Sequence, residues 1–77
     1  MKLMGHAKVN ENETRKIFDF AEPTVVKVEN VGHRDVIVKA NNKDFNLNQG
    51  ASISISAGSA HLECVGEGVV AWVVVAS

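Results

Sequence analysis

Three histidines, one cysteine and nine acidic side chains are the groups of this 77-residue chain that could take part in acid–base, nucleophilic or metal chemistry. The densest group is the run His61-Leu62-Glu63-Cys64, whose residue types suit a thiol–imidazole pair or a metal site. Side chains three residues apart on a strand point to opposite faces, so His61 and Cys64 cannot meet there. His61 and Glu63 share a face and could form a weak surface metal site or acid–base pair, but a solvated polar face is the favoured interpretation.

The remaining groups show no pattern typical of a catalytic site. His6 and His33 lack metal-ligand spacing to each other or to His61, and Cys64 is expected to be a small buried residue rather than a reactive thiol. The sequence contains no glycine-rich phosphate loop, nucleophile elbow or zinc-protease helix, and its carboxylates are scattered singly. We therefore expect no enzymatic activity, no catalytic or metal-binding residue, and no cofactor.

The elements that would position these groups are short strands. Thirteen valines against three leucines are typical of a packed, pleated surface. In the segment 51–57, apolar residues alternate with three serines, which gives one dry and one wet face. The expected fold class is all-β, a small antiparallel β-sandwich or barrel of six to seven short strands. Turn residues between the apolar runs predict strands near 14–20, 24–30, 35–40, 43–48, 51–57, 60–65 and 69–76.

The start of the domain permits two interpretations. Residues 10–21 could form a helix, because Asn10 could cap it and Glu13 could complete a capping box. A strand is favoured, because residues 15–20 also follow a two-residue alternation. We expect residues 1–9 to be a flexible N-terminal arm and residues 10–77 to be a single β-sandwich domain.

Charge and hydropathy exclude several classes of protein. The formal net charge is −1 and basic residues are not concentrated anywhere, which argues against nucleic-acid binding and against a polybasic membrane anchor. The longest apolar run, residues 69–76, is less than half a membrane span, and the N-terminus lacks the apolar run of a signal peptide. These features predict a soluble protein made in a reducing cytoplasm, where a lone cysteine is common.

The length of the chain suggests that copies associate. Burial of roughly 4,500 Å² of apolar surface would contribute about 110 kcal/mol, while ordering the chain costs about 115 kcal/mol, so an isolated monomer is close to zero net stability. A single cysteine cannot form an internal disulfide, and no cluster of metal ligands is evident. Oligomerisation is the remaining way to stabilise so small a domain.

The final predicted strand offers a surface for such association. Residues 69–76 are apolar on both faces, so a strand with one face in water would expose a valine-rich strip. Either the strand is central and covered by the first segment of the domain, or a neighbouring subunit covers it. Two further apolar residues, one on each of two earlier strands, occupy positions where polar residues are expected. The candidate subunit-interface residues are Val69, Trp72, Val73, Val75, Val25 and Ile37.

A second surface that could bind a ligand is polar. Ser52, Ser54 and Ser56, with Asn46 and Asn48 on an expected neighbouring strand, would form a flat hydroxyl and amide face. Such a face could hydrogen-bond a sugar or a partner, but sugar-binding faces usually also stack aromatic rings, and this chain has no tyrosine and a single tryptophan. A solvated polar face is the favoured interpretation.

From residue 30 onward the order of turns and strands resembles the small β-sandwich modules of tailed-phage virions. The matching features are Asn-Val-Gly-His-Arg, Asn-Leu-Asn-Gln-Gly, Ser-Ile-Ser-Ile-Ser, Ala-Gly-Ser, Gly-Glu-Gly and the valine-rich final strand. The resemblance is to capsid decoration or cement proteins and related tail domains, and it covers residues 13–77. It implies a non-enzymatic structural protein of the virion, commonly a homotrimer, which clamps major capsid or other virion subunits.

Two functional hypotheses follow. The first is an oligomeric phage capsid decoration protein, made in the host cytoplasm and located on the virion, with no nucleic-acid or membrane partner. The second is a small immunoglobulin-like adhesion or carbohydrate-binding module that works as a monomer through the serine-rich face.

Overall fold

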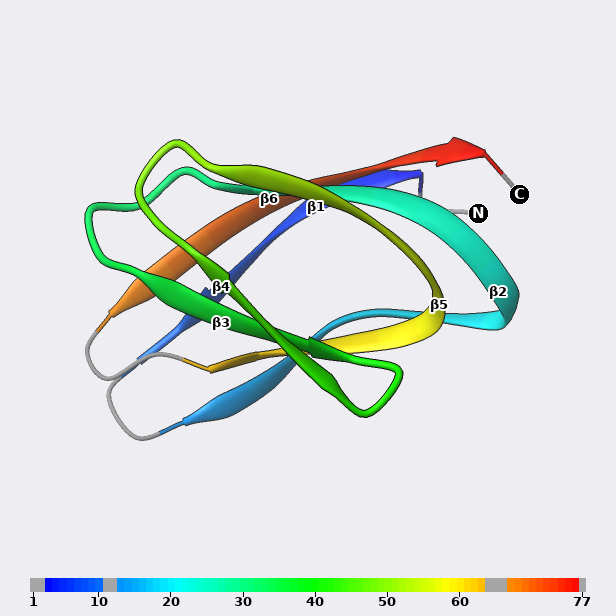
Figure 1. Cartoon of the computed structure of the whole chain (residues 1–77), viewed down its shortest axis with the longest axis horizontal. Helices are drawn as coiled ribbons and strands as arrows, with labels where there is room; N and C mark the ends of the chain where they lie inside the picture. Colours follow the sequence, from blue (N-terminus) through cyan, green and yellow to red (C-terminus); the bar gives the residue numbers. More distant parts are fainter. Residues whose placement is uncertain (1–2, 11–12, 64–66, 77) are drawn as a thin grey trace.

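In the computed structural model, which describes residues 3–10, 13–63 and 67–76, the chain forms antiparallel strands and no helix. The described residues form one hydrogen-bonded sheet in the order β1-β6-β2-β5-β3-β4. Figure 1 shows this sheet folded over on itself, with the start of β1 and the end of β6 at the same end of the molecule. The strands are β1 (Met4–Val9), β2 (Thr14–Asn30), β3 (Val36–Ala40), β4 (Lys43–Leu47), β5 (Ser52–Glu63) and β6 (Gly68–Ala76).

Two long strands connect the two layers of the folded sheet. The first half of β2 pairs with the second half of β5, where Thr14 lies opposite Glu63, and the second half of β2 pairs with the first half of β5, where Glu29 lies opposite Ser52. Because both strands bend, each contributes to both layers (Figure 1). We call the layer of β1, β6, the second half of β2 and the first half of β5 the β6 layer, and the remaining strands the β3 layer.

The bend has a visible cause in the sequence. The β2–β5 register shifts between Asp19 and Thr24, and this interval contains Pro23, which lacks the amide hydrogen that a ladder needs. On β5 the corresponding position is Gly58, where an added Cβ would lie 3.3 Å from the carbonyl oxygen of Phe20. A side chain there would require the backbone at Phe20 to shift by a few tenths of an ångström, so proline and glycine both suit the close approach of the strands at the bend.

The core lies between the layers and is almost entirely apolar. An aromatic cluster occupies one part of it: the rings of Phe18 and Phe20 have centroids 5.5 Å apart, and each lies 6.0 Å from the ring of Trp72. Asn30 is the one buried polar residue of the described part of the chain. The other buried hydrophobic residues are Ala7, Val9, Ile17, Val26, Val28, Val36, Val38, Ala40, Leu47, Ile55, Ala57, Ala60, Leu62 and Val70.

The β3–β4 hairpin turns on two asparagines. Asn41 and Asn42 both have positive φ, 54° and 60°, which is the left-handed pair of conformations of a type I′ turn. Asparagine tolerates this region better than most residues. The amide of Asn41 also donates a hydrogen bond of 2.9 Å to the carbonyl of Ser56, which ties the hairpin to β5.

The predicted fold class is confirmed, with several changes in its elements. The predicted strands 14–20 and 24–30 are one strand, β2, and those at 51–57 and 60–65 fall on β5, whose last described residue is Glu63; Cys64 and Val65 lie outside the described residues. The helix considered for 10–21 is wrong where the structure describes it, because β2 begins at Thr14.

The expectation of a flexible arm over residues 1–9 is wrong for Met4–Val9, which form β1 and pair along β6 from Met4↔Val73 to Val9↔Gly68. The physical reason is an alternation that uses small residues on the inside. Ala7 and Val9 are buried, while Met4 and His6 are exposed. The strand therefore closes the core at the edge of the β6 layer.

Candidate functional site

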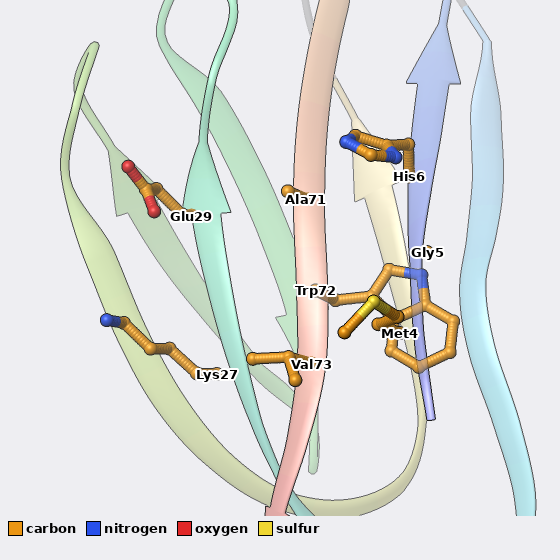
Figure 2. A pocket seen from close by; sticks show the side chains of 8 residues that line it. All are labelled: Met4, Gly5, His6, Lys27, Glu29, Ala71, Trp72 and Val73. Carbon is orange, nitrogen blue, oxygen red and sulfur yellow. The ribbon is translucent and has the colours of Figure 1, made fainter. Parts of the chain in front are cut away.

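The outer face of the β6 layer carries a shallow groove of about 720 Å³. Its floor is the outward row of β6, Ala71 and Val73, which are half-buried. Figure 2 shows β1 on one flank of this row and β2 on the other, so that each level of the groove crosses three strands. The lining residues are Met4, Gly5, His6, Lys27, Glu29, Ala71, Trp72 and Val73.

The strand register fixes two levels across the groove. At one level His6 lies opposite Ala71, which lies opposite Glu29. At the next level Met4 lies opposite Val73, which lies opposite Lys27. Each level thus has an apolar centre, with a charged side chain on the β2 flank (Figure 2).

Exposed apolar surface is concentrated on this layer. Within the described part of the chain, four large apolar side chains are exposed: Leu3 at 53%, Met4 at 64%, Val31 at 48% and Val75 at 53%. Leu3 directly precedes β1, Met4 is its first residue, and Val75 is near the end of β6. Val31 follows β2 and donates a backbone hydrogen bond of 3.1 Å to Val69 of β6. Three of the four therefore lie on or next to β1 and β6, and clustered exposure marks an interaction surface more often than scattered exposure does.

Two opposite charges of the groove have no partner of their own. Lys27 and Glu29 are exposed on the same face of β2, and neither forms an ion pair with any other described residue. By contrast, Lys8 on β1 pairs with Glu67 at 3.2 Å. The groove therefore offers one free ammonium and one free carboxylate beside an apolar floor.

The outer face of the β3 layer is different, because charged residues there pair with each other. The ammonium of Lys39 lies 3.2 Å from the carboxylate of Glu63, and that of Lys16 lies 3.1 Å from Asp19. The hydrogen bond from Lys39 to Glu63, together with the negative charge of Asp44, raises the pKa of Lys39 above its ordinary value. This face is therefore solvated and electrostatically satisfied.

The structure weakens the case for a His61–Glu63 metal or acid–base site. In the strand register His61 lies between Lys16 on β2 and Lys39 on β3, and Glu63 already holds Lys39. Two neighbouring ammonium groups disfavour binding of a metal cation. Across residues 3–10, 13–63 and 67–76, no three His, Cys, Asp or Glu side chains are grouped so that they could hold a metal ion. A polar groove of about 400 Å³ does lie on this face, between His61, Lys39 and the Asn41-Asn42 turn.

The candidate interface residues are divided among three environments. Trp72 faces the core and is 6% exposed, so although it is among the lining residues of the groove it offers a partner little surface. The reason is its neighbour on β1, Gly5, which has no side chain and leaves room for the indole ring (Figure 2). Ile37 is half-buried on the β3 layer, beside Glu63 and Asn46. The candidates on the β6 layer are Val25, Val69, Val73 and Val75.

The structure also changes the predicted serine and asparagine face. Ser52, Ser54 and Ser56 are exposed on β5, but they lie beside β2 and belong to the β6 layer. Asn46 lies on β4, which pairs with β3 and belongs to the other layer, so the prediction that Asn46 shares a face with the serines is wrong; Asn48 lies in the connection between β4 and β5. The aromatic rings of Phe18, Phe20 and Trp72 pack against one another, with Phe18 and Phe20 stacked and Trp72 tilted or edge-on to them, instead of standing on this surface.

The groove residues of β1 and β2 are not among the candidates that the sequence suggests. Met4 and His6 fall in the segment expected to be an arm, and Lys27 and Glu29 have the pattern of ordinary solvated positions on a strand. The signal that could have found β1 is the alternation of Met4 and His6 with small residues, which is typical of a strand.

Comparison with known proteins concerns the fold. No protein-family model matches the chain, and no curated protein matches it. A de novo designed double-stranded β-helix is similar with a TM-score of 0.73 and 12% identity, over 96% of this chain and 100% of that one. The chain has a double-stranded β-helix fold.

Two natural proteins share this arrangement. The SPY1581 protein of unknown function from Streptococcus pyogenes is similar with a TM-score of 0.69 and 18% identity, over 100% of this chain and 68% of that one. The cupin domain of CENP-C from Drosophila melanogaster has a TM-score of 0.57 and 14% identity, over 95% of this chain and 60% of that one. At these identities the likeness describes the fold alone. Among the described residues no helix is long and apolar enough to cross a membrane.

Proposed function

We propose that this chain is a non-enzymatic structural protein that acts by assembly, and that copies associate through the outer face of the β6 layer. One observation carries the proposal: three of the four exposed large apolar residues, Leu3, Met4 and Val75, lie on or next to β1 and β6, while the β3 layer presents paired charges. Covering an apolar face removes it from water and contributes stability that a domain of this size needs.

The strand order supports the same surface. β6 lies between β1 and β2, so its edges are hydrogen-bonded, but its outward row of Val69, Ala71 and Val73 is half-buried at the surface. Of the two alternatives for this strand, a covering first segment and a covering subunit, the first segment lies beside β6 as β1. A second copy is the occupant that we propose for the face itself.

The specific role that we propose is decoration of a phage capsid, as the order of turns and strands from residue 30 onward suggests. In this role the chain would join neighbouring shell subunits by binding the major capsid protein, and the resemblance favours a trimer. Particles purified on a density gradient from the source culture should then contain the chain, detectable by peptide mass spectrometry. A chain found only in the fraction free of particles would exclude this role.

Native mass spectrometry tests the assembly itself. We expect an oligomer at micromolar concentration, and a cooperatively folded monomer would overturn the proposal. Val73→Asp places a charge on the floor of the groove and should yield monomers. Ile37→Asp places the same charge on a half-buried position of the other layer and should leave the mass of the oligomer unchanged. Circular dichroism of both variants shows whether they remain folded.

A further inference from the structure

We infer that the groove of the β6 layer is occupied by a second copy of this chain, placed by a two-fold axis that runs across the strands. In this arrangement Lys27 of each copy faces Glu29 of the other. The inference rests on the proposed function, that copies associate through this face, and it adds the geometry and the pairing residues.

The first argument is the spacing of the two charges. Lys27 and Glu29 are two residues apart on β2, so they share a face and stand about 7 Å apart along the strand. A rotation of 180° about an axis that crosses β2 midway between them exchanges the two positions. Sheets packed face to face lie about 10 Å apart, a gap that a lysine and a glutamate side chain reach across together.

The second argument is the shape of the groove floor. The same rotation sets Ala71 of one copy opposite Val73 of the other, so that a small residue meets a larger one twice. It also sets Met4 opposite His6, which fills the β1 flank of the groove. Small and large side chains that alternate across a sheet interface can interdigitate.

The third argument is electrostatic. Lys27 and Glu29 have no ion pair within the described chain, and covering them without partners would cost free energy. In the two-fold contact Lys27 of each copy pairs with Glu29 of the other, so the dimer contains two such ion pairs. A two-fold axis along the strands would instead set Lys27 opposite Met4 and Glu29 opposite His6, which leaves the ammonium of Lys27 unpaired. The axis across the strands is therefore favoured.

Such a contact would cover a modest fraction of the protein surface. A stable interface of standard size buries about 800 Å² on each partner, which is about one sixth of the 4784 Å² exposed by the described chain. The β6 layer forms one of the two broad sides of the folded sheet (Figure 1). Its outer face extends from the serines of β5 across β2 and β6 to β1.

A charge-exchange experiment tests the pairing. In K27E homodimers acidic side chains would face each other, and in E29K homodimers basic ones would, so each variant alone should dissociate with a Kd raised at least about 100-fold. A mixture of the two sets the two acidic side chains of one copy against the two basic ones of the other. It should therefore form a one-to-one dimer, which native mass spectrometry detects when one variant is labelled with ¹⁵N. The double variant K27E/E29K should recover the homodimer.

The matched control is K43E, which makes the same charge change at an exposed residue of β4. This variant should remain a dimer in native mass spectrometry. A wild-type monomer would overturn both the proposed function and this inference. A wild-type trimer, or a wild-type dimer that the single variants do not weaken, would overturn the two-fold pairing and leave assembly standing. Failure of the mixed variants to form the one-to-one dimer would also overturn the pairing. Because both residues are exposed, circular dichroism should show folded protein throughout.

Discussion

The side-chain amide of Asn30 donates a hydrogen bond of 2.9 Å to the carbonyl of Leu47, which joins the end of β2 to the end of β4 seventeen residues later. The same amide donates a second hydrogen bond, of 2.7 Å, to the carbonyl of Arg34, and its oxygen accepts one of 3.0 Å from the amide of Gly32. Asn30 thus holds the β2–β3 connection against the β3–β4 hairpin from inside the protein.

Replacement of Asn30 should destabilise the fold severely. Asn30→Ala leaves two carbonyls and one amide without their partner, and we expect a loss of about 3 kcal/mol in the free energy of unfolding. Asn30→Asp keeps the shape and the acceptor for Gly32 but cannot donate to Leu47, so it should also destabilise. Urea denaturation at fixed protein concentration measures both. Asn48→Ala, at an exposed position, is the control and should change stability by less than about 0.5 kcal/mol.

Trp72 should behave as a core residue and not as an interface residue. Trp72→Ala removes the ring that packs against Phe18 and Phe20 and should cost about 3–5 kcal/mol. Val75→Ala, which truncates an exposed side chain of the same strand, should cost less than about 0.5 kcal/mol when both substitutions are made in the K27E variant, which we expect to be monomeric. Denaturation midpoints measure the comparison. Equal effects of the two substitutions would contradict the orientation of β6.

The stability of the β3–β4 turn should depend on the residue at position 42. With φ at 60°, Asn42→Val forces a β-branched residue into the left-handed region and should destabilise by about 1–2 kcal/mol. Asn42→Gly suits the same backbone and should be close to neutral. Thermal unfolding of the two variants separates backbone conformation from loss of the side chain. A tolerated valine would show that the turn does not need positive φ.

The Lys39–Glu63 pair should stabilise the folded protein by an amount that depends on pH and salt. Because the pKa of Lys39 is raised in the folded protein, the fold binds this proton more tightly than the unfolded chain does. The stabilisation is therefore complete below the ordinary lysine pKa of 10.5 and is lost as the pH rises through the higher folded value.

The variant Glu63→Gln removes the charge that Lys39 faces. Its urea midpoint should be slightly below that of the wild type at pH 8, and the difference should vanish above the folded pKa of Lys39 and shrink in 1 M salt, about ten times the usual ionic strength. A difference in midpoint that grew as the pH rose would contradict a raised pKa of Lys39.

The sequence is most informative where polar and apolar residues alternate strictly. The segment 51–57 corresponds to the first half of β5, and residues 24–30 to the second half of β2, because each of these has one face on the core and one in water. The turn at Asn41-Asn42 is also predictable, since few residues adopt the left-handed conformation. In these places local pattern and global fold agree.

The predictions from sequence are wrong where a strand packs through small residues or passes from one layer to the other. β1 buries Ala7 and Val9 beside Gly5, and so weak an apolar pattern resembles that of an arm. The bends of β2 and β5 resemble turns between separate strands, because Pro23 and Gly58 are typical of both. The groove depends on β1, so it could not be found without that strand.

The bends of β2 and β5 also govern how the protein comes apart. Each long strand is covalently continuous through both layers, so neither layer can open without removing hydrogen-bond partners from the other. The most protected amides in hydrogen exchange should therefore lie in both layers and exchange together, in a single global event. We therefore expect the domain to unfold as one cooperative unit, without a state in which one layer stays folded while the other is open.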